Sequence, residues 1–430
     1  MASPTSTYCD YATGNDYKGA SFTDGAYTSA TKTLVKLNAF AASKANHWLY
    51  LESNDGGSIV AGYYKIATWT DASTVILATD AGAGVDDDAA KCTQADGTTS
   101  KPWRSIQGAL DLMTKDTTNG DQINVKAGTA QVNQAALSFT VYGANAEGAP
   151  LVIRGYTSTA GDGGIGEIDC GGFQPFGAGA RTDLYLYDLE LHSFGNNIGI
   201  YPGARSNMYH CEVHKGASSP SSKQLVYSMA WVVGCYVHDA GTTGTGIAST
   251  YAFNNYVKDC PTGLNCFGAM NGNLVVDCTT YGIRADLDSI QIIGNSVYSS
   301  TAATGKGIGV TSTASGNAVL NNIVEGYSGS GGIGISAAAD LGAIGYNAFY
   351  NNATNESLTD VLFDLGGDQT PASSPFTNAG AGDFSLNAAV AGAIETAWPG
   401  AWYGPASTTN KADMGAVQKG AGVSGPPGWL

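Results

Sequence analysis

Between residues 180 and 350, short runs of alternating apolar and polar residues recur along the chain. They read YDLELHS (187–193), YHCEVHK (209–215), VGCYVHD (233–239), FNNYVKD (253–259), GNLVVDC (272–278), IGNSVYS (293–299) and LNNIVEG (320–326). Aligning Leu191, Val213, Val237, Val257, Val276, Val297 and Val324 gives spacings of 22, 24, 20, 19, 21 and 27 residues. A repeat of short strands cannot bury its own apolar face, so each unit must stack on its neighbour. The pattern therefore predicts a right-handed parallel β-helix with coils about 4.8 Å apart.

The segments before the repeat have different patterns. Strand-like runs separated by turn residues, HWLYLES (47–53), AGYYKIATWT (61–70) and STVILATD (73–80), predict a small β module over residues 1–90, and VDDDAAKC (85–92) reads as a polar connector. Ser100 and Pro102 then favour the start of a helix that carries Trp103, Ile106, Leu110 and Met113 at helical spacing. We expect an all-β chain: an attachment module over 1–90, a β-helix with an N-terminal capping helix over 91–418, and a tail over 419–430.

The repeat also predicts which side chains point into the β-helix. Because side chains alternate along a strand, the aligned column and the column two residues earlier should share the inner face. The earlier column consists of Leu189, Cys211, Cys235, Asn255, Leu274 and Asn295. We expect its asparagines to form an amide ladder. The chain has 8 cysteines and no CxxC pair, which predicts buried free thiols rather than a structural zinc site.

Charge and composition exclude several classes of partner. The chain has 20 Lys and Arg against 36 Asp and Glu, a net charge of −16, so neither nucleic acid nor an anionic membrane is an expected partner. Charged residues make up only 13% of the chain and Gly is abundant at 59, as is typical of a protein rich in short strands and turns. No run is apolar enough to span a membrane, and the N-terminus has neither the basic region nor the apolar region of a Sec signal peptide. We therefore do not expect export by that route.

The column that follows the aligned apolar position should face outward. It contains His192, His214, His238, Lys258, Asp277 and Tyr298. Three imidazoles on adjacent coils would lie near 4.8 Å apart, close enough to share a transition metal. The alternative is a ladder of stacked rings that face solvent and bind nothing. His192, His214 and His238 are thus candidate metal ligands, although no metal or other cofactor is the primary expectation.

A second group of candidates lies in YGIRADLDS. Alternation would place Arg284, Asp286 and Asp288 on one face, with neighbouring members about 7 Å apart. Two carboxylates at that spacing suit calcium or an acid/base pair at a glycosidic bond, whereas the alternative is simply a solvated charged strand. The run 86–88 of three aspartates reads as a solvated linker, and no GxSxG, HExxH, P-loop or dinucleotide motif occurs.

Two stretches resemble the pectin-lyase-like superfamily of right-handed parallel β-helices. DGTTSKPWRSIQGALDLMTKDTTNGDQINVKAG (96–128) is similar to its opening, in which a capping helix precedes the first coil, and DFSLN (383–387) with ADMGAVQ (412–418) is similar to its closing segment. The resemblance implies the fold but no single activity. Arg284 after GNLVVDCTTYGI also resembles the arginine of chondroitinase-B-like and alginate lyases. The resemblance would further require a lysine base and calcium-binding acids, which TGLNCFGAMNG (262–272) lacks, while Lys258 is displaced in register.

The N-terminal module with its GYYKI strand resembles those that precede β-helices in tailed-phage structural proteins. This implies a non-enzymatic virion protein, a capsid decoration, head fibre or tail spike, assembled in the host cytoplasm and attached through 1–90. Expected partners are copies of itself, a trimer among the options, other virion proteins and a cell-surface glycan. The alternatives are a secreted polysaccharide lyase or glycoside hydrolase and, third, a bacterial adhesin.

Overall fold

The computed structural model describes residues 5–52, 58–82, 84, 87–92, 94–95, 97–133, 136–139, 149–176, 183–194, 198–203, 205–215, 224–311, 314–387 and 390. The chain divides into two compact units, an N-terminal unit (1–175 and 183–190) and a C-terminal unit (176–182 and 191–430). The predicted boundary at residue 90 does not coincide with this division. The predicted tail at 419–430 and the stretch at 412–418 lie outside the described residues. Within those residues, no helix is long and apolar enough to cross a membrane.

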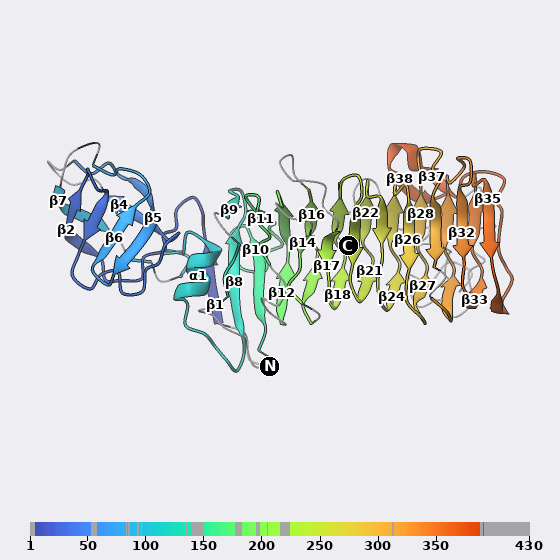
Figure 1. Ribbon diagram of the computed structural model, residues 1–430, viewed down its shortest axis with the longest axis horizontal. Helices are drawn as coiled ribbons and strands as arrows, with labels where there is room; N and C mark the ends of the chain where they lie inside the picture. Colours follow the sequence, from blue (N-terminus) through green and yellow to red (C-terminus); the bar gives the residue numbers. More distant parts are fainter. Residues whose placement is uncertain are drawn as a thin grey trace. The chain divides into compact units, whose positions relative to one another are not determined.

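A closed antiparallel barrel occupies the first part of the N-terminal unit (Figure 1). Its strands, in the order β2-β3-β6-β5-β4-β7, are β2 (Phe22–Thr28), β3 (Thr33–Val35), β4 (Trp48–Glu52), β5 (Gly62–Asp71), β6 (Thr74–Leu77) and β7 (Asp87–Cys92). Tyr17, Phe22 and Phe40 pack edge-on and tilted in its core. The prediction of a polar connector over 85–92 is wrong, because Asp87–Cys92 is the strand that closes the barrel between β2 and β4.

The barrel is inserted after the first strand of the coil stack. Strand β1 (Thr5–Cys9) precedes the barrel in sequence but pairs in parallel with β8 (Asp121–Lys126), which is followed by β10 (Leu151–Tyr156) and β12 (Leu184–Tyr187). A second face of these first coils is formed by β9 (Gln131–Val132) and β11 (Gly166–Asp169). The module predicted over 1–90 therefore includes one strand of the stack.

Helix α1 (Ile106–Leu112) packs against β1 and β8 with Ile106, Ala109 and Leu110 buried. It begins at Ser105 rather than Ser100, because the Ser105 Oγ accepts a hydrogen bond from the Gly108 amide at 2.9 Å. The same hydroxyl donates to the buried carboxylate of Asp16 at 2.7 Å. The local sequence could not predict Ser105 as the N-cap, because Ser105 is held by Asp16, which is distant in the sequence. The function of α1 as a cap of the stack stays a prediction.

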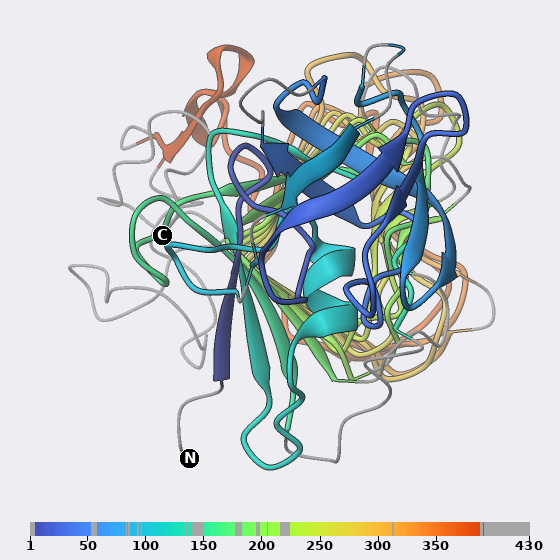
Figure 2. The ribbon, with the colours of Figure 1, turned by 90° about the vertical axis from the view of Figure 1, so that its left-hand side faces the viewer.

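Three parallel sheets form the C-terminal unit, and its coils lie behind one another in Figure 2. Sheet 1 contains β15 (Asn207–Tyr209), β18 (Trp231–Val233), β21 (Tyr251–Phe253), β24 (Ala269–Asn271), β27 (Gln291–Ile293), β30 (Asn317–Leu320), β33 (Leu341–Gly345) and β36 (Val361–Asp364). Sheet 2 contains β16 (Glu212–His214), β19 (Tyr236–His238), β22 (Tyr256–Lys258), β25 (Leu274–Val276), β28 (Ser296–Tyr298), β31 (Ile323–Glu325) and β34 (Ala348–Tyr350). Sheet 3 contains β14 (Ile198–Ile200), β17 (Gln224–Tyr227), β20 (Thr245–Ala248), β23 (Thr262–Leu264), β26 (Tyr281–Ala285), β29 (Lys306–Val310), β32 (Ile333–Ala337) and β35 (Thr354–Leu358). The predicted all-β class and parallel β-helix are confirmed.

The turn between sheets 1 and 2 explains how each coil bends. One residue in the left-handed region stands there on successive coils: His210, Gly234, Asn254, Gly272, Gly294 and Asn321. Glycine and short polar residues tolerate this conformation best, which accounts for the Gly/Asn punctuation of the repeat. A second corner follows sheet 2, where Asp239, Asp259 and Asp277 have positive φ.

The inner face follows the predicted columns with one shift of register. Val213, Val237, Val257, Val297 and Val324 pair from coil to coil and are fully buried. On the intervening coil, however, Val275 and not Val276 continues the column, and Asn273 replaces Leu274 in the column before it. The run Leu274–Val276 has two adjacent valines, so the sequence could be aligned with the repeat in two ways that differ by one residue. A shift of one residue exchanges the side chains of the inner and outer faces.

The predicted asparagine ladder runs along this inner face. Asn273 donates from both its backbone amide and its side-chain amide to the Oδ1 of Asn295, each at 3.0 Å, and Asn295 repeats both bonds to Asn322. The ladder continues through Asn347 and ends where the Asn347 amide donates to Asp368. All eight cysteines are buried thiols that form no disulfide, as predicted.

A C-terminal hairpin covers part of the outer face of sheet 2 (Figure 1). It consists of β37 (Phe376–Asn378), the short 3-10 helix η1 (Ala379–Ala381) and β38 (Asp383–Leu386). Phe376, Phe384 and Leu386 pack there against outward side chains of β25, β31 and β34, namely Leu274, Val276, Ile323 and Ala348. The motif at 383–387 is thus part of an outer cover.

Candidate functional site

The three predicted histidines form a stack on the outer face of sheet 2. The rings of His192, on β13 (Leu189–His192), and His214 lie 5.2 Å apart between centroids, with their planes 19° apart. His214 pairs in register with His238, and their ring centroids lie 4.9 Å apart at 14°. All three side chains are half-buried. The coil spacing thus brings the three imidazoles together; that they bind a metal stays a prediction.

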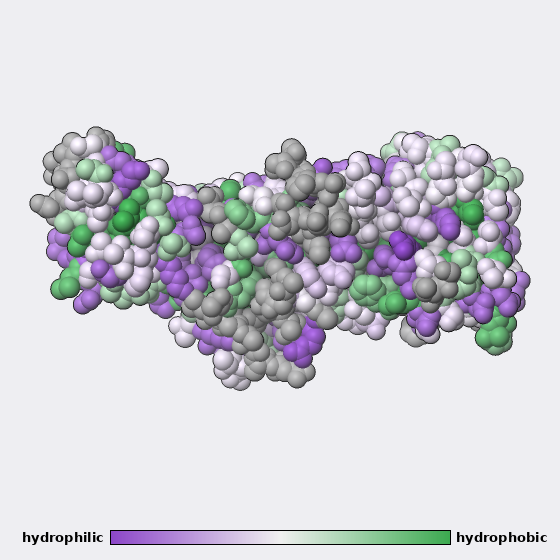
Figure 3. Space-filling model, in the orientation of Figure 1, coloured by the Kyte–Doolittle hydropathy of each residue, from purple (hydrophilic) through white to green (hydrophobic). Residues whose placement is uncertain are grey.

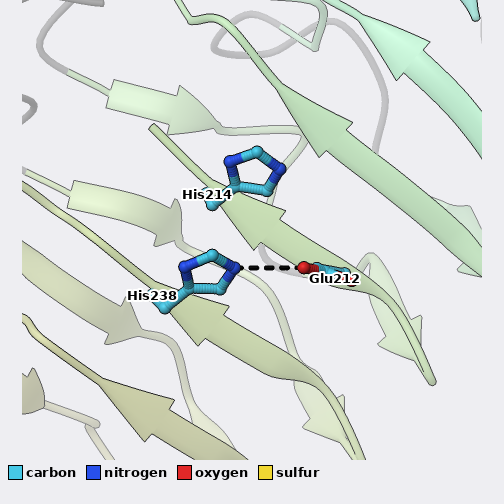
Figure 4. Close-up of side chains that lie close together, drawn as sticks. All are labelled: Glu212, His214 and His238. Atoms are coloured by element: carbon cyan, nitrogen blue, oxygen red, sulfur yellow. Dashed lines mark hydrogen bonds and ion pairs between the residues drawn. The ribbon is translucent and has the colours of Figure 1, made fainter. Parts of the chain in front are cut away.

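Two carboxylates hold the His238 ring from opposite sides. Its Nε2 lies 3.1 Å from the Glu212 Oε1 (Figure 4). Its Nδ1 lies 2.7 Å from the Asp239 Oδ2. Glu212 belongs to β16 and points outward beside His214, because the two residues are separated by one inward residue, Val213. The sequence reasoning missed Glu212, although its position two residues before a candidate histidine was a sufficient signal.

The charges of this cluster alter its ionisation. The hydrogen bond with His238 lowers the pKa of Glu212, whereas burial raises it. The charges of His214 and His192 lower it further, so that the pKa of Glu212 is lowered overall. Burial of the ring lowers the pKa of His238, but the hydrogen bonds with Glu212 and Asp239 outweigh it, so that its pKa is raised overall. The cluster therefore favours a positively charged group between the two carboxylates.

Beyond His238, the outward column differs from the prediction. Lys258 follows His238 in register, and its Nζ lies 2.9 Å from the Asp259 carboxylate. The next position is occupied by Val276, because Lys258 pairs with Val276 in β25. Asp277 is the corner residue after the strand, where its carboxylate accepts a hydrogen bond from the Ser300 amide at 2.6 Å. Val276 thus interrupts the polar column, which resumes on the next coils with the predicted Tyr298 and with Glu325.

Arg284, Asp286 and Asp288 do not lie on one face of a strand, and a catalytic or calcium-binding role for them stays a prediction. Strand β26 ends at Ala285, so Arg284 lies on the strand while both aspartates lie in the following turn. The Arg284 Nε donates to the Asp286 Oδ1 at 2.8 Å. Asp288 instead accepts hydrogen bonds from the amide and hydroxyl of Ser315. The predicted arrangement of all three on one strand face is wrong because the strand is too short to include them.

A lysine that the sequence reasoning did not consider lies near Arg284. Lys306 on β29 pairs in register with Tyr281 on β26. Its Nζ lies 5.6 Å from the centroid of the Tyr281 ring, and the Arg284 guanidinium carbon lies 5.4 Å from the same centroid. Two cations therefore share one aromatic ring on the outer face of sheet 3. Lys306 comes 22 residues after Arg284, in the next repeat, so only the coil register reveals the proximity.

Aromatic side chains form a further outward group on sheet 1, which we call the aromatic ladder: Trp231, Tyr251 and Phe253. Trp231 pairs in register with Tyr251, and their ring centroids lie 4.7 Å apart. The Phe253 ring stacks on Trp231 at 5.3 Å. Trp231 is 43% exposed, although large aromatic side chains are usually mostly buried. An added Cβ at Gly268 would come within 2.7 Å of the Tyr251 ring, so a glycine is needed where that ring lies over the next coil.

Comparisons with known proteins bear on the fold alone. No protein-family model and no curated protein matches the sequence. The chain is similar in structure to the pectate lyase Pel9A, with 14% identity, a TM-score of 0.47 and coverage of 76% of this chain and 93% of the lyase. It is also similar to a GH136 lacto-N-biosidase from Eubacterium ramulus, with 13% identity, a TM-score of 0.32 and coverage of 63% and 66%. At these similarities the activities belong to those two enzymes, and the resemblance to tailed-phage proteins stays a prediction.

Proposed function

We propose that this protein is a structural, non-enzymatic β-helix that binds a neutral glycan on its aromatic ladder. The observation that carries the proposal is the exposed Trp231, which stacks on two partly exposed rings: Tyr251, its partner in register, and Phe253. Sugar rings present apolar C–H faces and polar edges, so they pack against exposed aromatic rings and leave their hydroxyls in water. Contiguous exposed apolar groups on a soluble protein are typical of binding sites.

The position of the ladder supports a chain-like ligand. Its rings lie on adjacent coils of a parallel sheet, about 4.8 Å apart along the coil axis, which is close to the length of one sugar residue. The face drawn in Figure 3 carries separate hydrophobic areas among hydrophilic ones rather than one continuous apolar face. The ladder thus offers a narrow contact, as a saccharide chain requires.

The charge of the chain favours a neutral glycan over an acidic one. A net charge of −16 repels a polyanion at long range, whereas it has no such effect on an uncharged saccharide. This distinguishes the proposed ligand from the acidic polysaccharides on which lyases act.

The test compares Trp231→Ala with Phe363→Ala on an array of neutral and acidic glycans. Phe363 is 60% exposed on β36 of the same sheet and serves as the matched control. We expect wild type and Phe363→Ala to bind the same neutral glycans, and Trp231→Ala to lose at least tenfold in affinity by calorimetry. Binding that is unaffected by Trp231→Ala, or confined to acidic glycans, would contradict the proposal.

We further propose, from the resemblance to tailed-phage proteins, that this scaffold is displayed on a virus particle and self-associates through its N-terminal barrel. The barrel has its own apolar core, and the segments that enter and leave it are linked where the Ala95 amide donates to the Tyr17 carbonyl at 2.7 Å. Light scattering of the full chain tests self-association, with an oligomer expected. A monomer at all accessible concentrations would contradict this part of the proposal.

A polysaccharide lyase is the second candidate, and the pair of cations at Tyr281 is the observation that favours it. A β-elimination needs a base that removes the proton next to the carboxylate and a cation that stabilises the developing charge. Lys306 and Arg284 are the groups available for these functions. Unsaturated-product absorbance with acidic polysaccharides, lost in Lys306→Ala and Arg284→Ala, would replace the non-enzymatic proposal.

A further inference from the structure

We propose that Glu212, His214 and His238 form a binding site for a divalent transition-metal ion, with Asp239 as the group that orients His238. One potential ligand atom from each of the three residues lies within 4.8 Å of the other two. The residues come from two adjacent strands, β16 and β19, and the two rings face the same side of sheet 2 as the glutamate (Figure 4).

The adjustment required for a metal is small. Metal bonds of about 2.1 Å place the donors of a tetrahedral site about 3.4 Å apart. The Glu212 Oε1 and His238 Nε2 are already 3.1 Å apart. The ligand atom of His214 lies within 4.8 Å of the other two and has to move by a side-chain rotation to complete the site, while the strands that carry both histidines are held by their register. A backbone of this kind is a rigid support for a site.

Asp239 is the observation that separates this cluster from an ordinary stack of rings. Histidines that bind metals almost always donate their second ring N–H to a carboxylate, which fixes the tautomer and orientation. The 2.7 Å contact between the His238 Nδ1 and Asp239 provides this arrangement. It leaves Nε2 as an acceptor directed at another acceptor, the Glu212 carboxylate. Two facing acceptors need a cation between them, either a proton or a metal ion.

The donor set selects the class of ion. Two imidazoles and one carboxylate suit zinc, copper and nickel, whereas calcium and magnesium prefer six or more oxygen ligands. The fourth position would be filled by water. His192 stacks on the side of His214 that faces away from His238 and is not one of the proposed ligands. Removal of His192 should therefore weaken metal binding less than removal of His214.

Calorimetry with Zn²⁺ and visible spectroscopy with Co²⁺ test the proposal on the full chain. We expect one ion per chain and a Co²⁺ spectrum with ligand-field bands of nitrogen coordination. His214→Ala, His238→Ala and Glu212→Gln should each weaken Zn²⁺ binding at least tenfold, and Asp239→Asn roughly tenfold to a hundredfold, as is usual for the orienting carboxylate.

His210→Asn is the matched control. His210 belongs to the same repeat unit but occupies a corner with φ of 51°, which asparagine adopts readily. It should bind Zn²⁺ like the wild type, and circular dichroism should show every variant folded. Absence of Zn²⁺ and Co²⁺ binding to the wild type, an equal loss in His210→Asn, or unchanged binding in His214→Ala would each overturn the proposal.

Discussion

The outer face of sheet 2 has two parts that share one backbone but differ in their surroundings. Along β16, β19 and β22 it carries imidazoles, tyrosines, Glu212 and Lys258, which are partly exposed. Along β25, β31 and β34 it carries Leu274, Val276, Ile323 and Ala348, covered by the C-terminal hairpin. The change occurs between two paired residues, Lys258 and Val276, on adjacent coils.

This comparison shows that the register of the coils determines where a side chain lies on sheet 2. Whether the C-terminal hairpin buries that side chain then determines its ionisation. Under the hairpin, Glu325 is 6% exposed, and burial raises its pKa to about 7 although the Ser374 hydroxyl donates to it at 2.8 Å. In the uncovered part, Glu212 keeps a lowered pKa because it faces His238. Two glutamates on the outer face of one sheet are therefore shifted in opposite directions.

The largest expected effect comes from removing the Phe376 ring, which packs the C-terminal hairpin against sheet 2. Phe376→Ala deletes a ring that is 1% exposed and packs against Tyr298 and Phe384, which should cost about 3–5 kcal/mol of hairpin stability. Hydrogen exchange of the amides in 376–386 should accelerate accordingly, while the amides of β16 and β19 stay protected. Phe363→Ala, at an exposed position, should change neither region.

The second effect depends on pH. Glu325 stays neutral in the folded protein up to about pH 7, whereas in the unfolded chain it ionises above its ordinary pKa of 4.5. Between these values the native state binds more protons, so stability must fall as pH rises, by up to about 3 kcal/mol. Glu325→Gln should remove this pH dependence from the hairpin stability that hydrogen exchange of the amides in 376–386 reports between pH 5 and pH 8. An unchanged slope would show that Glu325 is solvated.

The smallest effect is expected in the uncovered part. His238→Val removes two ion pairs, with Glu212 and Asp239, whose members are all partly exposed, so the free energy of unfolding from urea denaturation should change by no more than about 2 kcal/mol. A loss comparable with that of Phe376→Ala would mean that the histidine stack is a structural core and that the two parts do not differ as described.

The inner columns could be predicted from the sequence because burial imposes an alternation that repeats at every coil. Val213, Val237 and Val257 lie inside as predicted, and the asparagine ladder follows the same rule. The slip at Val276 arose because the hairpin lets the outer face of β25 be apolar too, so the strand has no polar side to mark its register. The barrel insertion after β1 and the contact of Lys306 with Tyr281 depend on distant segments and have no local signal.

Cysteine labelling across the border between the two parts tests the central claim most directly. All eight native thiols are buried, so a single introduced cysteine dominates the reaction with a thiol reagent. Lys258→Cys should react rapidly, and Val276→Cys, its partner in register, should be protected until Phe376→Ala opens the hairpin. Equal rapid labelling at both positions in the otherwise wild-type chain would contradict the account.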